Sequence, residues 1–320
     1  MTKVQQIAPG VYRLLCGFVN VYFLGAPGEP WVLVDTGVPG DDHAIAKAAE
    51  KTYGKERPPA AILLTHGHGD HSGSAGRLSE LWNVPVYAHR LERPYLTGLC
   101  GYPPMDPTVG GFAGFASRFV PMALVNLGAR LTDLADDGTL PGLTEWRWVK
   151  ASGHTPGHVA FYRESDGVLI AGDALTTLRL NSAGGNLFKK RSIYGPPEAS
   201  TSDWEGAEAT VRRLAQLAPQ VLAGGHGSPF LAGDNLAVQL STFAALYKAP
   251  KRGRYVHIAA HSDETGVVSI PPAPGDPLRP VVAGATIVSI AVCAWLFARR
   301  SGFKHSHEVE AVLDTSQDNQ

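Results

Sequence analysis

The chain has 320 residues and a formal net charge of −1, from 28 Lys and Arg against 29 Asp and Glu. This length allows one large α/β domain or two smaller ones. Because no excess of positive charge is available to hold a phosphate backbone, nucleic acid is excluded as the expected partner. The cysteines Cys16, Cys100 and Cys293 form no CxxC pair, which argues against a disulfide framework and a cysteine-built zinc site.

The first part of the chain alternates strand and helix patterns. Residues 11–24 and 31–34 are rich in β-branched and aromatic residues and are interrupted by Gly and Pro, as paired strands are. Residues 41–54 open with two aspartates and end with a glycine, which predicts a helix. Strands are then predicted at 60–64 and 84–89, with a helix at 74–82 between them. This alternation indicates α/β layering.

Residues 90–144 have a different composition, rich in Gly, Pro and Phe, and are too interrupted for a regular helix of that length. We expect an insertion that covers another part of the molecule, with a surface excursion without function as the alternative. The alternating patterns then resume, with strands at 146–151, 158–163, 167–172 and 220–225 and helices at 203–218 and 234–248.

The C-terminal region contains an uncharged apolar run at 281–298. As a helix it would be roughly 27 Å long, close to the thickness of a hydrocarbon core. This run predicts a single transmembrane anchor, with a buried helix of the domain as the alternative. The predicted organisation is a large domain at 1–249 that includes the 90–144 insertion, a linker at 250–280, the anchor at 281–298 and a polar tail at 299–320.

The side of the membrane is argued from two opposing observations. Arg299, Arg300 and Lys304 follow the predicted span, whereas Arg279 alone precedes it, and this favours a cytoplasmic tail. The N-terminus, however, has no signal peptide that would export the large domain ahead of the span. We therefore expect a membrane-anchored protein whose large domain, at 1–249, is cytoplasmic.

Side chains of the metal-ligand type follow four of the predicted strands. In α/β proteins such strand ends converge on one crevice, so the side chains can meet. Imidazole and carboxylate are ligands that zinc prefers, and seven of them exceed one tetrahedral site. Two zinc ions that share Asp173 and one hydroxide would use all seven. The residues are His66, His68, Asp70, His71, His154, Asp173 and His226.

The first four of these residues lie within the stretch THGHGDH at 65–71. Gly67 and Gly69 lack a Cβ and let the chain turn tightly. Asp70 and His71 are adjacent, so they need a turn to serve one ion. We expect a loop here, because it fits this arrangement better than a regular strand or helix.

The stretch THGHGDH matches the HxHxDH signature of the metallo-β-lactamase superfamily, and four further motifs occur in that family's order. These are VLVDTG with Asp35, GHTPGH with His154, AGDAL with Asp173 and GGHGSP with His226. The resemblance covers about residues 10–245, and five ordered elements make a specific match. The chain thus resembles this superfamily, and within it the glyoxalase II-like group of zinc-dependent hydrolases.

The resemblance implies an αββα sandwich with the site at one edge. It places His66, His68 and His154 on a first zinc ion and Asp70, His71 and His226 on a second, with Asp173 bridging them. It implies a hydroxide between the ions as the nucleophile. Asp70 would also orient that hydroxide or pass a proton to the leaving group, and Asp35 would fix the HxHxDH segment or a ligand imidazole.

Two further residues have weaker signals. His158 is expected to be a hydrogen-bonded neighbour of the ligands, because the seven others already fill two sites. Tyr194 lies in the loop after Asp173 and is a candidate for binding a substrate oxyanion, with an ordinary loop tyrosine as the alternative.

The expected function is that of a dinuclear zinc hydrolase acting on a small-molecule ester, thioester, lactone or lactam. One alternative is a mononuclear iron sulfur dioxygenase of the same superfamily, which the complete second set of ligands disfavours. Another is a membrane-tethered metal-binding protein without catalysis. It is disfavoured because structural zinc sites are closed by four protein ligands, whereas three per ion leave room for water.

Overall fold

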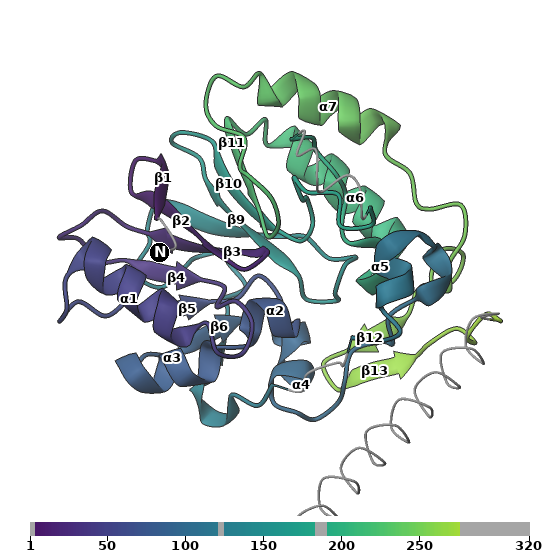
Figure 1. Cartoon of the computed structure of the whole chain (residues 1–320), viewed down its shortest axis with the longest axis horizontal. Coiled ribbons are helices and arrows are strands. Elements are labelled where there is room, and N and C mark those ends of the chain that lie inside the picture. The colour runs from purple at the N-terminus through teal and green to yellow at the C-terminus, as the bar shows by residue number, and fades with distance from the viewer. Residues whose placement is uncertain (1–3, 121–124, 183–190, 276–320) are drawn as a thin grey trace, which may run out of the picture. The chain divides into compact units, whose positions relative to one another are not determined.

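The computed structural model describes residues 4–120, 125–182 and 191–275 (Figure 1). The contacts divide the chain into a compact unit, Met1–Pro274, and a second unit, Gly275–Gln320. Of the second unit only its first residue is described. The fold and the candidate site therefore belong to the first unit.

Seven strands of the described residues form the first sheet, in the order β1-β2-β3-β4-β5-β6-β7. Neighbouring strands are antiparallel from β1 to β4 and parallel from β4 to β7. The bounds are Gln5–Ala8, Val11–Cys16, Val19–Leu24, Val32–Val34, Ile62–Leu63, Val86–Ala88 and Leu131–Asp133. The predicted paired strands of residues 11–24 are thus confirmed as β2 and β3.

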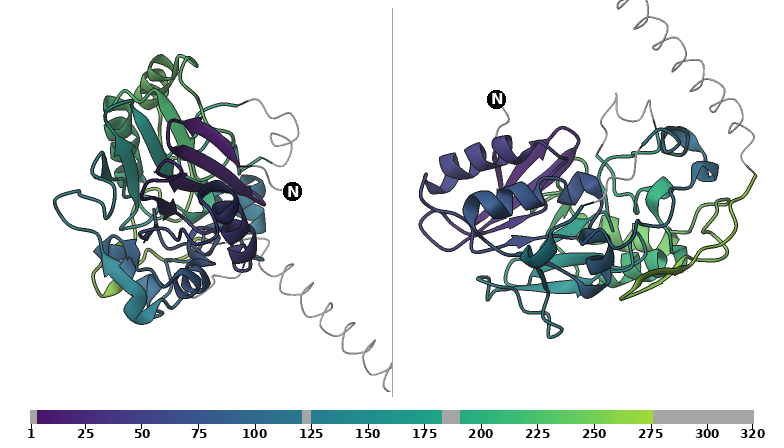
Figure 2. Two further views of the ribbon diagram at one scale, coloured as in Figure 1. Left: turned by 90° about the vertical axis from the view of Figure 1, so that its left-hand side faces the viewer. Right: turned by 90° about the horizontal axis from the view of Figure 1, so that it is seen from below.

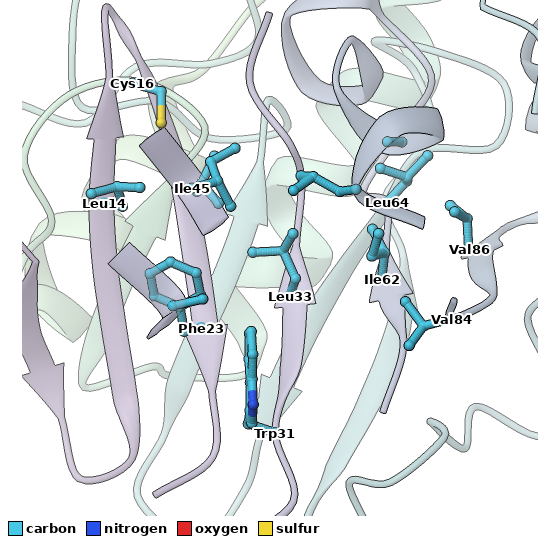
Figure 3. Close-up of a cluster of buried hydrophobic side chains, with 14 of the residues drawn as sticks. Leu14, Cys16, Phe23, Trp31, Leu33, Ile45, Ile62, Leu64, Val84 and Val86 are labelled. Carbon is cyan, nitrogen blue, oxygen red and sulfur yellow. The ribbon is translucent and has the colours of Figure 1, made fainter. Parts of the chain in front are cut away.

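Helices α1 (Asp42–Tyr53) and α3 (Ala75–Trp82) cover one face of this sheet (Figure 1). The buried residues of α1 recur at helical spacing, and Ile45 packs in one apolar cluster with Phe23, Leu33 and Ile62 (Figure 3). Both helices were predicted from the sequence, and both lie within the predicted ranges. Burial of this apolar stripe fixes them on the sheet.

The second sheet has the order β11-β10-β9-β8. Its strands are β8 Trp146–Lys150, β9 Val159–Arg163, β10 Val168–Gly172 and β11 Val221–Gly224. Helices α6 (Trp204–Gln216) and α7 (Leu236–Leu246) cover its outer face, where Val211 and Leu240 join one cluster with Leu169 and Leu222. Asp203 caps α6, since its side chain accepts a hydrogen bond from the Gly206 amide.

The two sheets pack face to face around a second apolar core. Tyr22 and Val34 from the first sheet share this cluster with Phe161 and Ile170 from the second. Every residue of β3, β9 and β10 is buried, because these strands have packing partners on both faces. The resulting order of helix, sheet, sheet and helix agrees with the predicted αββα sandwich, and Figure 2 shows it from two further directions.

The segment 90–144, expected to be an insertion, is composed of short elements. It contains β7, which is hydrogen-bonded to β6 at the edge of the first sheet. Its helices are η1 Arg90–Glu92, α4 Arg93–Leu96, η2 Pro107–Val109, α5 Gly111–Ala116 and η3 Gly128–Arg130. Outside the segment, η4 comprises Glu198–Ser200, and the hairpin β12 (His261–Asp263) and β13 (Gly266–Ser269) lies in the expected linker 250–280.

The strands that carry the predicted ligands end at a common edge. β4 is parallel to β5, β10 is parallel to β11, and β8 and β10 are both antiparallel to β9. The segments after β4 and β5 therefore lie at one end of the first sheet, and the segments after β8, β10 and β11 lie at one end of the second. This topology brings distant parts of the sequence to one place, as expected for strand ends in α/β proteins.

The expected membrane anchor requires a correction. The longest helix of the described residues, α6, has 13 residues and is about 20 Å long, whereas a hydrocarbon core is about 30 Å thick. Within residues 4–120, 125–182 and 191–275, no helix has both the length and the apolar character needed to cross a membrane. This finding overturns the expected membrane-anchored location. The run 281–298 lies outside the described residues.

Candidate metal centre

The HxHxDH segment begins just after β5 and ends in the short helix α2 (Gly69–Ser72). The sequence predicted a loop here, and the difference has a physical reason. A helical turn lets the adjacent residues Asp70 and His71 approach one centre from neighbouring directions. Asp70 Oδ2 lies 3.6 Å from His226 Nε2, and His71 Nε2 lies 3.4 Å from Asp173 Oδ1.

The structure brings all seven predicted ligands together. Their donor atoms form overlapping groups, in each of which the atoms lie within 4.8 Å of one another. These groups are His66, His68 and His154; His66, His71 and Asp173; and Asp70, His71 and His226. The first and third groups are the two ligand sets that the sequence implied. The assignment of each set to an ion stays a prediction.

The first group consists of imidazoles alone. His68 Nδ1 lies 3.1 Å from His66 Nε2 and 3.0 Å from His154 Nε2. Burial lowers the pKa of His68 to about 4, and burial together with the neighbouring imidazoles lowers the pKa of His66 and His154 well below the usual value. The three rings are therefore neutral at physiological pH, which is the state that binds a metal.

Asp173 lies between the first group and the third group. Its Oδ1 is 3.4 Å from His71 Nε2, while its Oδ2 is 3.3 Å from His226 Nε2 and 3.5 Å from His154 Nε2. Burial opposes ionisation of Asp173, but His226 and His71 outweigh it and hold its pKa well below the usual value. An ionised carboxylate in this position could bind a metal ion on each side, as the predicted bridge requires.

Four of the ligand imidazoles are held by their second ring nitrogen. Such contacts set the tautomer and leave the other nitrogen free for a metal. Phe18 makes two contacts with His226. Its carbonyl oxygen lies 3.0 Å from His226 Nδ1, and its ring stacks on the imidazole with the ring centroids 5.6 Å apart. The other contacts are His66 Nδ1 with Thr65 Oγ1 at 3.0 Å, His71 Nδ1 with Asp35 Oδ2 at 2.8 Å and His154 Nδ1 with Thr201 Oγ1 at 3.2 Å.

Asp35 and His158 lie next to the predicted ligands. The Asp35 carboxylate also accepts a 2.8 Å hydrogen bond from the Thr65 amide, so it connects His71 to the start of the HxHxDH segment. Its backbone is left-handed, with φ of 58°, a conformation that Asp and Asn tolerate best among residues with a Cβ. His158 Nε2 accepts a 3.0 Å hydrogen bond from the Asp173 amide and thereby holds the turn after β10.

The role of Glu92 was not predicted from the sequence. The buried Glu92 carboxylate accepts hydrogen bonds from the amides of Gly67 at 2.9 Å and Gly157 at 2.7 Å, and from Thr155 Oγ1 at 2.8 Å. The Tyr102 hydroxyl also donates to Glu92. Glu92 therefore links the segment that carries His66 and His68 to the one that carries His154. No motif marks it, because it lies in the segment expected to be an insertion.

A cavity of about 370 Å³ opens against the ligands and is lined in part by His68, Asp70, Asp173 and His226. Tyr194 does not line it. It lines a separate cavity of about 270 Å³, which shares only Leu180 and Pro197 with the first. The predicted contact between Tyr194 and a substrate oxyanion stays a prediction, and the position of its side chain does not favour it.

The centre has the features expected of a divalent metal site. His71 Nε2 and Asp173 Oδ1 are buried and form no hydrogen bond with any described residue, an arrangement that is costly unless a cation lies between them. A Cβ on Gly225 would lie 2.2 Å from Asp173 Oδ1 and 2.7 Å from His71 Cε1. The glycine thus keeps this space open. The donor set of imidazoles and carboxylates fits zinc or a similar ion.

Comparison with known proteins agrees with this geometry. The metallo-beta-lactamase superfamily model matches residues 14–226. The probable metallo-hydrolase YflN of Bacillus subtilis (strain 168) is 38% identical over 75% of this chain and 91% of its own. The probable metallo-hydrolase YybB of the same organism is 26% identical over 68% of this chain and 84% of its own.

A solved structure shares the fold. The metallo-beta-lactamase family protein TTHA1429 from Thermus thermophilus is similar with a TM-score of 0.51 and 25% identity, over 75% of this chain and 81% of that protein. The names of the relatives agree with the predicted enzyme class, a metal-dependent hydrolase. With the five motifs in order and their residues gathered at one sheet edge, the chain belongs to the metallo-β-lactamase superfamily.

Proposed function

We propose that the chain is a hydrolase that uses two zinc ions to cleave the ester, thioester, lactone or lactam bond of a small molecule. The observation that carries this proposal is the overlap of the donor groups: the first and second share His66, and the second and third share His71. Asp173 of the second group also lies 3.5 Å from His154 and 3.3 Å from His226. A single structural zinc would need only four ligands. Seven ligands, four of which line one open cavity, support a pair of ions with room for a substrate.

The ions and the protein would contribute different parts of the chemistry. Zinc bound here would lower the pKa of a water molecule and polarise the acyl oxygen of the substrate. Asp70 is the more open of the two ligand carboxylates on the cavity wall, since 29% of its side chain is exposed against 4% of Asp173. We assign Asp70 the orientation of the attacking water and the transfer of a proton to the leaving group.

The chain's own residues prepare the centre for these steps. Asp35, Phe18 and Thr201 fix the orientation of ligand imidazoles through the contacts described above. Preorganised ligands need not reorient when a substrate binds. The complete third group, Asp70, His71 and His226, favours two ions over the single iron of a sulfur dioxygenase.

The test uses the purified full chain, first stripped with a chelator and then loaded with zinc, iron or manganese. Metal content is measured per chain, and turnover is followed on a panel of esters, thioesters, lactones and lactams. We expect about two zinc ions per chain and turnover that is lost on stripping and restored by zinc. Asp70→Ala and His154→Ala should reduce kcat/KM by roughly 10²-fold or more, on the order expected for the loss of a general acid or a metal ligand.

His257→Ala is the matched control, because His257 is exposed and belongs to none of the donor groups. It should keep wild-type metal content and turnover. Unchanged turnover in the metal-free protein, or in both Asp70→Ala and His154→Ala, would contradict the proposal. A single bound iron with no hydrolysis would favour the dioxygenase instead.

A further inference from the structure

The cavity beside the metal centre is apolar on the walls away from the ligands. Phe18 from the β2–β3 turn, Val38 after β4 and Met105 from the segment before α5 contribute three of these walls. Ala113 of α5, Val120 and Leu180 after β10 add further apolar surface. These segments are distant in sequence, so the apolar lining is a property of the assembled fold.

In the part of the chain that the structure describes, the charged groups that line the cavity lie at its metal end. Among the described lining residues the only charged side chains are the ligands Asp70 and Asp173, and no Lys or Arg is present. The hydroxyl of Tyr102 is already used, since it donates to Glu92 and accepts a 3.0 Å hydrogen bond from the Gly67 amide. A substrate with a carboxylate in its acyl part would therefore lose hydration at these walls without gaining a protein cation.

We propose that this cavity binds an uncharged, apolar acyl chain, so that the substrates are esters or thioesters of medium-length aliphatic acids. The inference rests on the function proposed above and names its substrate class. Water adds to the acyl carbon, the bond to the ester oxygen or thioester sulfur breaks, and a carboxylic acid and an alcohol or thiol leave. The cavity volume of about 370 Å³ is in the range of small-molecule sites, which are usually apolar with a few polar groups that set orientation.

Chain length is the first test, made on the zinc-loaded full chain. The probes are p-nitrophenyl acetate, butyrate, hexanoate and octanoate, together with the p-nitrophenyl half-ester of succinic acid. We expect kcat/KM to rise by about threefold to fourfold for each added methylene until the cavity is filled, which is the usual effect of burying a methylene. The succinyl half-ester should react at least roughly tenfold more slowly than the butyrate ester, because its carboxylate is buried without a partner.

Substitutions in the wall form the second test. Met105→Arg adds a cation to the apolar wall and should shift the ratio of kcat/KM for the succinyl and butyryl esters by about tenfold toward the succinyl ester. Ala113→Trp fills the cavity and should lower kcat/KM for octanoate more than for acetate. Val238→Arg makes the same charge change on α7, where the side chain is 57% exposed and outside the cavity. It should leave both ratios unchanged.

The outcomes separate this inference from the proposed function. A flat chain-length profile, or a succinyl ester that reacts as fast as butyrate, overturns the inference while zinc-dependent turnover keeps the hydrolase proposal. Zinc-dependent turnover of lactones or lactams alone would also overturn the inference. Absence of zinc-dependent turnover on these esters and on the panel of thioesters, lactones and lactams, with two zinc ions bound, overturns the hydrolase proposal itself. The chain-length profile of the wild-type protein decides the inference even where a wall variant does not fold.

Discussion

Glu92 Oε2 accepts a 2.9 Å hydrogen bond from the backbone amide of Gly67, the residue between the first two ligand histidines. The other carboxylate oxygen, Oε1, accepts hydrogen bonds from the Gly157 amide and from the hydroxyl of Thr155, the residue after the ligand His154. One buried side chain thus sets the spacing of two ligand segments that are far apart in sequence.

Glu92→Gln is predicted to weaken metal binding and to destabilise the fold. The new amide group would place an N–H against one of the backbone N–H donors, which leaves a buried group unpaired and lowers the free energy of unfolding by about 1–3 kcal/mol. Zinc affinity should fall by about 10- to 100-fold, as for other residues that support ligands. Urea unfolding of the stripped protein and competition with a chromophoric chelator measure the two effects.

The control for Glu92 is Glu29→Gln, which makes the same chemical change on an exposed side chain. It should leave both quantities at the wild-type value. Equal zinc affinity in Glu92→Gln and the wild-type protein would contradict the positioning role of Glu92.

Two substitutions of Asp35 separate its backbone role from its carboxylate role. Asp35→Ala places alanine at a left-handed φ of 58° and leaves the buried Thr65 amide unpaired, so the free energy of unfolding should fall by about 2–4 kcal/mol. Asp35→Asn keeps the left-handed preference and the hydrogen bond to Thr65, but not a full carboxylate for His71. It should lose less stability than Asp35→Ala and bind the second metal about tenfold or more weakly.

Thermal unfolding of the stripped proteins and zinc stoichiometry at limiting metal measure these two effects. If both variants lose the same stability and keep two zinc ions, the two roles are not separable as argued.

Gly225→Ala is predicted to abolish metal binding at the bridge. The added methyl group would lie 2.2 Å from Asp173 Oδ1 and 2.7 Å from His71 Cε1, and neither short, buried side chain can move away without leaving its partners. Gly101→Ala is the matched control, because a Cβ there meets nothing within 4 Å. Metal analysis after gel filtration should give fewer than two zinc ions for Gly225→Ala alone. Full occupancy in that variant would show that the site lies elsewhere.

His89 is predicted to make the fold less stable in mild acid. Burial lowers the pKa of His89 below its usual value of 6.5, so the unfolded chain takes up a proton more readily than the folded one. The contribution of His89 to stability is therefore fully present above about pH 6.5 and is lost as the pH falls through the folded pKa.

His89→Asn removes this titration and keeps a side chain that can accept the hydrogen bond from the Leu91 amide. Urea unfolding at pH 7.5 and pH 5.5 should show a larger loss of stability for the wild-type protein than for His89→Asn. The same loss in both proteins would mean that the titration of His89 does not contribute.

Much of the architecture could be predicted from local patterns. The helices α1 and α3 and the paired strands β2 and β3 lie where spacing and end residues placed them, because amphipathic periodicity and capping act within short stretches of chain. The conformation of residues 69–72 could not be predicted in the same way. Glycines permit both loop and helix, and only the need to turn Asp70 and His71 toward partners on other strands selects α2.

The sequence by itself determined the family, the layered fold and the seven candidate ligands, because those depend on residue types at fixed spacings along the chain. Only the tertiary structure decided that Glu92 joins two ligand segments, that Phe18 holds His226 and that Tyr194 faces a different cavity. It also decided the apolar character of the walls around Met105 and Ala113. These properties arise from contacts between residues far apart in the chain, which no local periodicity or spacing records.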